Sequence, residues 1–268
     1  MAAYIFCPDN DLISFSVYTK MKKDKADVEL VTEKDLVFAK IWKHEITENG
    51  NVSTTIVLSD GRIIISSDIQ YLFNRILSFQ MLHFTNANDR SYAAMEQTAL
   101  YTSFVKSINA VLFEPFVTEH LSAYQNNIWR VYQCAVDAGF PVADLHYTSA
   151  PRKYPAETGK VLSYDGVNCP VQLNRNSFIN LNQPVFSTEP FEKKISITVV
   201  NNQVFGTDIE LDKTSIENFS HLINKIFYEL LIGTKKGKYF FINANLYPVT
   251  VTQEVVNALS ENIKLKIP

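Results

Sequence analysis

The sequence predicts an α/β protein, and three features of its pattern predict this class. The chain opens with an apolar run at residues 3–7, an amphipathic stretch at residues 12–23 and a β-branched run at residues 28–31, which is the order of a strand, a helix and a strand. An Asn-Gly pair at residues 49–50 separates two strand-like runs and is a strong hairpin signal. A second amphipathic stretch, at residues 122–138, ends at a glycine, as helices often do.

The first helix is predicted by the spacing of its apolar residues. Ile13, Val17 and Met21 recur at four-residue intervals, which places them on one helical face. A turn-like cluster at residues 8–11 separates this helix from the first strand. We therefore expect the chain to begin with a small α/β domain.

A β-meander is expected to follow. Residues 38–46 and 52–58 are rich in β-branched residues, and the Asn-Gly turn joins them. A second turn at Asp60-Gly61 leads to three isoleucines at residues 63–65, and residues 67–75 are expected to close the meander.

The remaining elements are predicted by periodicity and by stop signals. Gly139 and Pro141 mark the end of the helix over residues 122–138. Asn201-Asn202 and Lys236-Gly237 are expected turns. Between residues 163 and 190 the chain is polar and has few helix signals. The other expected elements are helices at residues 89–112 and 216–231, strand fragments at residues 145–151 and 160–162, a hairpin at residues 194–207 and a final core strand at residues 239–242.

The composition excludes several classes of function. A net charge of −3 gives no polycationic surface, so we expect no nucleic-acid partner. No apolar run is long enough to span a membrane, and the first residues do not read as a signal peptide. Three widely spaced cysteines without a Cys-x-x-Cys pair suit buried thiols in a reducing compartment. We expect a cytoplasmic protein without a membrane partner.

Five local signatures then occur in a familiar order along the chain. They are Leu-Phe-Asn-Arg at residues 72–75, Ala-Gly-Phe-Pro-Val at 138–142 with Tyr-Thr-Ser-Ala-Pro at 147–151, Gly-Lys-Val-Leu-Ser at 159–163, the hairpin at 191–205, and Gly-Lys-Tyr-Phe-Phe-Ile-Asn-Ala-Asn at 237–245. Together they resemble the graspetide synthetases, ATP-grasp ligases that make macrocyclic esters and amides in ribosomal peptides. The resemblance implies a pre-ATP-grasp domain at residues 1–120 and a shortened ATP-grasp region, of α+β lobes, at residues 121–268.

The resemblance also implies nucleotide-binding positions. The family's phosphate-contacting lysine matches Lys160, and its adenine-side glutamate lies near Glu189 and Glu192. Each has an ordinary alternative, because charged residues of this kind are most often solvated on the surface. ATP and magnesium are expected as cofactors only if the site is functional.

The family's metal and phosphate set is poorly matched. Its metal-binding Asp, Glu and Asn fall on Leu230, Asn243 and Asn245, and its hairpin arginine falls on Ser196. Glu229 lies one residue from the Asp position and, on a strand, would face the opposite side. Magnesium needs hard oxygen ligands, chiefly carboxylates. A retained site would therefore use Glu229, Asn243 and Asn245, although the two asparagines suit a turn before Pro248 equally well.

These departures lead to three functional hypotheses and leave enzymatic activity open. The first is a pseudoenzyme that binds a precursor peptide or a partner maturation enzyme in ribosomal peptide modification. We expect its peptide surface near Tyr71, Phe73 and Arg75 and the aromatic loop at residues 79–84, as an edge-strand addition. The second is an active ligase that uses the rearranged metal set with Lys160. The third is an α/β binding protein without nucleotide. A homodimer is also open.

Overall fold

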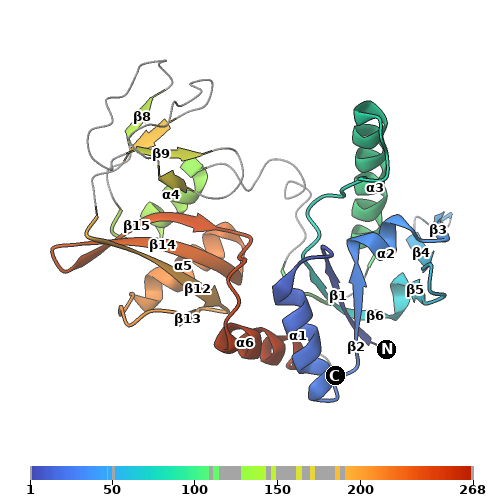
Figure 1. The fold of residues 1–268 in the computed structure, drawn as a ribbon. Helices are drawn as coiled ribbons and strands as arrows, with labels where there is room; N and C mark the ends of the chain where they lie inside the picture. Colours follow the sequence, from blue (N-terminus) through green and yellow to red (C-terminus); the bar gives the residue numbers. More distant parts are fainter. Residues whose placement is uncertain are drawn as a thin grey trace. The chain divides into compact units, whose positions relative to one another are not determined.

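The computed structural model divides into two compact units (Figure 1). Unit 1 comprises Met1–Ser122 and Val249–Pro268, and unit 2 comprises Ala123–Pro248. The residues that the structure describes are 2–46, 48–49, 52–108, 111–114, 128–142, 146–148, 161–164, 170–172, 185–187 and 191–266.

Unit 1 is built on a four-stranded parallel sheet. Its strand order is β2 (Val28–Thr32), β1 (Ala2–Cys7), β6 (Ile69–Asn74) and β7 (Val111–Leu112). The predicted strand–helix–strand opening is confirmed, because α1 (Leu12–Lys23) connects β1 to β2 and buries Ile13, Val17 and Met21. On the other side of β1, Phe6 stacks against Phe104. Apolar elements therefore cover both faces, as a parallel sheet requires.

The predicted meander is confirmed, but its expected closing segment belongs elsewhere. β3 (Ile41–Ile46), β4 (Val52–Val57) and β5 (Ile63–Ile65) form an antiparallel sheet in that order. Residues 67–75 do not close it. They contribute β6, which pairs in parallel with β1. Residues 69–74 join the parallel sheet because Tyr71, Leu72 and Phe73 are all buried. Three consecutive buried side chains fit only a strand that is covered on both faces.

Two helices complete the meander side of unit 1. α2 (Glu33–Val37) begins with a capping box in which Thr32 and Asp35 each accept a backbone hydrogen bond from the other residue. α3 (Ala87–Ser107) ends five residues earlier than the sequence predicts, because the chain turns into β7.

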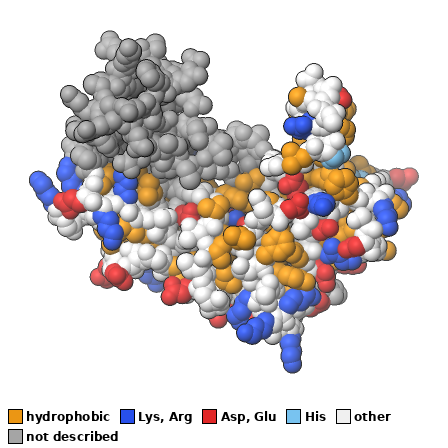
Figure 2. Space-filling view, in the orientation of Figure 1, with side chains coloured by type: hydrophobic (Ala, Val, Ile, Leu, Met, Phe, Trp, Pro, Cys, Tyr) orange, Lys and Arg blue, Asp and Glu red, His pale blue; other side chains and the backbone are white. Residues whose placement is uncertain are grey.

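Figure 2 shows apolar side chains mingled with charges of both signs on the drawn face of the described residues, without a large basic patch.

The C-terminal helix α6 (Gln253–Lys264) packs in unit 1 rather than with the second half of the chain. It lies beside α1 (Figure 1), and Lys264 forms an ion pair with Asp24 at the end of α1. The sequence-based division at residues 120 and 121 therefore assigns this segment to the wrong side. Buried Val255, Leu259 and Ile263 explain the packing, since they line one helical face.

Unit 2 contains a four-stranded antiparallel sheet with two helices on one face. The strand order is β13 (Gln203–Phe205), β12 (Lys193–Val200), β14 (Phe227–Lys235) and β15 (Lys238–Asn245). α4 (Ile128–Asp137) and α5 (Lys213–Ile223) pack with one face of this sheet in a single apolar core. The predicted helix end is confirmed, because Gly139 follows α4 with a φ of +89°.

The turns of this sheet are also confirmed. Asn201 and Asn202 have φ angles of +48° and +65°, and Lys236 and Gly237 have +51° and +71°. Two successive positive φ angles are the signature of a type I′ hairpin turn, and asparagine and glycine accept them readily.

The expected helix over residues 216–231 is wrong in its second half. α5 ends at Ile223, and Asn224 takes a left-handed conformation with a φ of +54°. The chain then enters β14 at Phe227. Asparagine in this conformation is a common helix stop, and the aromatic residues that follow suit a strand.

A second small sheet in unit 2 contains the expected strand fragments. β8 (His146–Thr148), β9 (Val161–Tyr164), β10 (Pro170–Gln172) and β11 (Val185–Ser187) pair antiparallel in the order β10, β9, β11, β8. None of the helices in the described ranges has the length and apolar character needed to cross a membrane.

Candidate functional site

The two faces of the β12–β14–β15 sheet differ in chemistry. Ile197, Leu230 and Ala244 point into the apolar core with α4 and α5. Their neighbours along the strands point the other way, because side chains alternate on a strand. We call this opposite side the polar face and define it by Ser196, Thr198, Glu229, Asn243 and Asn245.

Strand register brings the three predicted metal residues together on this face. Glu229 lies opposite Asn245 in the β14–β15 pairing, and Asn243 lies opposite Leu231. Thr198 is the partner of Glu229 on the other side, in β12. Thus Glu229 occupies the central strand between a hydroxyl and an amide.

Glu229 and Asn245 are linked directly. The Nδ2 atom of Asn245 donates a hydrogen bond of 3.2 Å to Oε2 of Glu229. The Oδ1 atom of the same asparagine accepts a 3.0 Å hydrogen bond from the backbone N–H of Tyr247. Both ends of the Asn245 amide are therefore occupied by protein groups. Glu229 is only 6% exposed, so its carboxylate is held inside the protein.

Leu230 shows why the expected carboxylate is missing from this face. Its side chain is fully buried in the apolar core. Glu229 points the opposite way, as predicted from strand alternation. An aspartate at position 230 would place a charge in the core, which is strongly unfavourable without a partner.

The residues of the polar face do not fit the magnesium set that the resemblance implies. The face carries one carboxylate, whereas the resemblance implies two carboxylates and an asparagine as magnesium ligands beside the phosphates. Asn245 directs its oxygen to Tyr247 rather than to a common point with Glu229. Within the described ranges, no three acidic, histidine or cysteine residues are grouped to hold a metal ion.

Two features of this face were missed from the sequence. A register shift between Leu231 and Ile232 leaves Ile242 as an extra residue in β15, and such bulges re-aim the side chains that follow. Lys194 lies two residues before Ser196 and therefore on the same face; partial burial lowers the pKa of its ammonium group. The two-residue alternation of side chains in β12 would have placed Lys194 on the same face as Ser196 from the sequence alone.

Of the three predicted nucleotide residues, only Glu192 belongs to the described residues. Lys160 and Glu189 lie outside the described residues. Glu192 is exposed, and its Oε1 atom accepts a 3.0 Å hydrogen bond from the backbone N–H of Lys236. It lies six residues before Thr198, roughly 20 Å along the strand at the usual rise per residue, so it serves the far hairpin end of the sheet.

The predicted peptide-binding residues belong to the core of unit 1. Tyr71 and Phe73 are each 2% exposed and Arg75 is 3% exposed, so none of them presents a surface to a peptide. Phe73 packs edge-on against Phe113, with ring centroids 4.7 Å apart. Arg75 forms an ion pair with Asp11, and its backbone N–H donates to the carbonyl of Phe6.

The aromatic loop after β6 gives a mixed outcome. Phe79 is buried and Phe84 is half-buried against the core. Leu82 is exposed, as a binding surface in this loop requires.

The backbone arrangement identifies the architecture. It matches the macrocyclase MdnC from Microcystis aeruginosa MRC, solved with precursor peptide MdnA, with a TM-score of 0.74 and 14% identity over 99% of this chain and 100% of that one. The chain has the fold of the ATP-grasp ligases. It also matches a Chryseobacterium gregarium RiPP-associated ATP-grasp ligase, solved with ADP and a leader and core peptide, with a TM-score of 0.70 and 15% identity over 100% and 98% of the two chains.

A third ATP-grasp structure agrees. The ligase PsnB, solved with a minimal precursor, Mg and ADP, matches with a TM-score of 0.69 and 16% identity over 98% of this chain and 96% of that one. No known family model and no curated protein matches the sequence. The structural matches run over nearly the whole length of each solved chain, which gives no support to the expected shortening of the ATP-grasp region.

Proposed function

We propose that the protein is a degenerate ATP-grasp protein that binds a peptide and acts as a scaffold partner in the modification of a ribosomally made peptide. The observation that carries the proposal is the hydrogen bond between Asn245 and Glu229. It engages the carboxylate of the polar face with a neutral amide, at the place where the resemblance puts a metal-binding cluster.

The physical argument is one of charge. ATP-dependent activation of a carboxylate places several negative charges around the transferring phosphoryl group, and cations must stabilise them. The resemblance calls for two carboxylates and an arginine, whereas this sheet has Leu230 on its core side and Asn243 and Ser196 on its polar face. An amide at position 243 supplies no charge to a metal ion.

A peptide is the partner that the comparisons favour. MdnC, the Chryseobacterium gregarium ligase and PsnB were each solved with a precursor peptide or a leader and core peptide. A chain with the same fold and without the metal cluster retains a scaffold on which such a peptide can be held. A second maturation enzyme is the alternative partner in this proposal. If the protein is a homodimer, light scattering should give twice the chain mass of 30.5 kDa.

The test is isothermal titration of the full chain with two ligands. The first is a candidate precursor peptide, sought among the short reading frames beside the gene, and the second is ATP with magnesium. We expect peptide binding and no tight, magnesium-dependent ATP binding. Tight binding of ATP with magnesium, accompanied by turnover of ATP to ADP, would contradict the proposal.

An active ligase with a rearranged metal site is the second candidate. One observation favours it: Glu229, Asn243 and Asn245 do lie on one face of adjacent strands. If these residues and Lys160 serve catalysis, Glu229→Gln abolishes ADP release. Unchanged ADP release in that variant counts against this candidate. The third hypothesis, an α/β binding protein without nucleotide, stays a prediction that the titration with ATP and magnesium also tests.

A further inference from the structure

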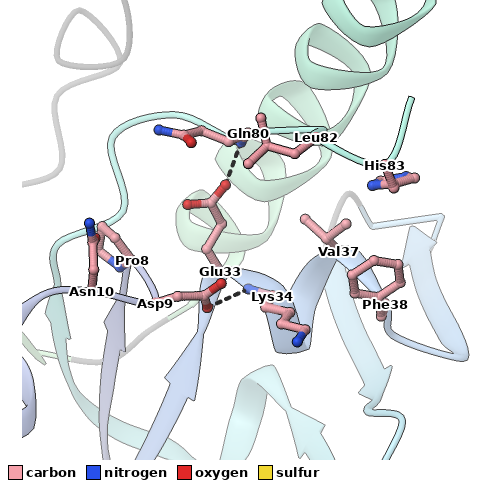
Figure 3. A pocket seen from close by; sticks show the side chains of 10 residues that line it. All are labelled: Pro8, Asp9, Asn10, Glu33, Lys34, Val37, Phe38, Gln80, Leu82 and His83. Atoms are coloured by element: carbon pink, nitrogen blue, oxygen red, sulfur yellow. Dashed lines mark hydrogen bonds between the residues drawn. The ribbon is translucent and has the colours of Figure 1, made fainter. Parts of the chain in front are cut away.

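Unit 1 contains a pocket that shares no residue with the polar face. Its volume is about 420 Å³, within the range of small-ligand sites. Three segments line it: the loop after β1, helix α2 after β2, and the loop that follows β6 (Figure 3). The pocket therefore lies at the carboxyl ends of three parallel strands. β1 has β2 on one side and β6 on the other, which is the kind of switch point where α/β sheets bind ligands.

One side of the pocket carries two carboxylates. Asp9 accepts a 3.1 Å hydrogen bond from the backbone N–H of Lys34, and Glu33 accepts one from the backbone N–H of Gln80. Each bond uses one carboxylate oxygen and leaves the other without a hydrogen bond among the described residues. Burial raises the pKa of Glu33, and the nearby negative charge of Asp9 raises it further.

Within the described part of the chain, these two carboxylates have no cationic partner. Among the described residues, neither Asp9 nor Glu33 forms an ion pair with a lysine or arginine. Lys34 also lines the pocket, and its side chain extends away from the carboxylate of Glu33 (Figure 3). The acidic side of the pocket is thus complementary to a positively charged group.

The opposite side of the pocket is apolar and partly aromatic. Phe38 is 48% exposed and Leu82 is 71% exposed, although both are large apolar side chains. The ring of Phe38 lies 5.2 Å, between centroids, from that of His83. Exposed apolar groups that gather at one place on a surface are typical of ligand and partner sites. Aromatic rings also attract guanidinium and ammonium groups.

We propose that this pocket binds an organic cation with an apolar or aromatic body. The cationic group would occupy the acidic side, between Asp9 and Glu33. The body would pack against Phe38 and Leu82 on the other side. A basic residue of a peptide next to a bulky apolar residue has this chemistry, and so does a free aralkyl amine. The pocket includes Leu82 of the loop at residues 79–84, where we expect the peptide surface, so binding of a peptide here would deepen the proposed function. The pocket shares no residue with the polar face, so a failure of this inference can be told apart from ATP turnover at that face.

The experiment uses three probes with the full chain in isothermal titration. They are an acetylated Arg-Phe amide dipeptide, the same dipeptide with neutral citrulline in place of arginine, and phenethylamine. Because a hydrogen bond to a charged group is stronger than one to a neutral group, we expect the arginine peptide to bind at least about tenfold more tightly than the citrulline peptide. Binding by phenethylamine without the arginine peptide would assign the site to free amines.

Matched variants locate the binding. Glu33→Gln and Asp9→Asn keep an oxygen for the backbone N–H groups and remove the charge, so each should weaken cation binding about tenfold without unfolding the protein. Glu96→Gln, an exposed residue of α3 outside the pocket, makes the same charge change and should have no effect. Circular dichroism melting checks folding.

Three results overturn the proposal. The first is equal binding of the arginine and citrulline peptides. The second is binding that the Glu33 and Asp9 variants leave unchanged. The third is the absence of binding by both cationic probes at about 10 mM, a concentration that populates even millimolar sites.

Discussion

The side-chain amide of Asn245 donates a 3.2 Å hydrogen bond to the carboxylate of Glu229 across the β14–β15 pair. Glu229 is almost completely buried, so this bond helps a charged group to remain inside the protein. In place of a cluster of carboxylates open to metal, the polar face presents a carboxylate held by a neutral neighbour.

Loss of this hydrogen bond should destabilise unit 2. In Asn245→Leu, the buried Glu229 carboxylate loses one donor, and the free energy of unfolding should fall by about 1–3 kcal/mol. Urea denaturation measures the change. Asn88→Leu on the exposed part of α3 is the control and should stay within about 0.5 kcal/mol of the wild type. Equal effects of the two substitutions would show that the Asn245 amide contributes nothing specific.

Arg75 is expected to act on stability rather than on peptide recognition. Its Nε and Nη2 atoms lie 2.5 Å and 3.2 Å from the two carboxylate oxygens of Asp11, which also accepts a bond from Ser14. Arg75→Leu leaves the Asp11 charge buried without this partner and should cost about 3–5 kcal/mol in chemical denaturation.

Neutralising Asp11 provides the matched control for that variant. The double variant Asp11→Asn, Arg75→Leu should recover part of the lost stability, because no charge then remains buried. Peptide affinity lost in a fully folded Arg75→Leu protein would contradict the structural role and support the peptide-binding role predicted from the sequence.

The sequence predicts turns and strand alternation well in this fold. Asn201-Asn202 and Lys236-Gly237 were identified because few residues accept positive φ angles, so the signal is local. The orientation of Glu229 away from the core also followed from the two-residue period of a strand. Both inferences depend on neighbours in the chain rather than on tertiary contacts.

Other features depend on distant packing and were not visible in the sequence. Residues 224–231 continue the apolar pattern of α5, and the chain becomes a strand because β12 and β15 lie on either side of it. The apolar face of α6 does not encode which unit it will cover. Burial of Tyr71, Phe73 and Arg75 follows from the placement of β6 beside β1, which a strand pattern alone does not specify.

The docking of α6 should show a pH dependence at acidic pH. Hydrogen bonds from Lys20 and then from Lys264 lower the pKa of Asp24 from 3.8 to about 2. Because the folded-state pKa is depressed, the stabilisation is present above pH 3.8 and is lost as the pH falls towards 2. Urea midpoints measured from pH 5 to pH 2 should fall more steeply for the wild type than for Asp24→Asn. Parallel curves would rule out this contribution.

Two of the cysteines should resist alkylation in the native protein. Burial raises the pKa of the Cys7 thiol to about 12 and also raises that of Cys134. Since the thiolate is the reactive form, iodoacetamide at pH 8 should label neither residue until the protein is unfolded. Mass spectrometry of peptides with and without urea gives the labelling of each site. Rapid native labelling of Cys7 would contradict its burial.

The most direct test of the degenerate site is an assay for ADP release by the full chain with ATP, magnesium and the precursor peptide. We predict no ADP release above a blank without protein, and the same result for Glu229→Gln. Peptide-dependent ADP release that Glu229→Gln abolishes would contradict this account and establish an active ligase.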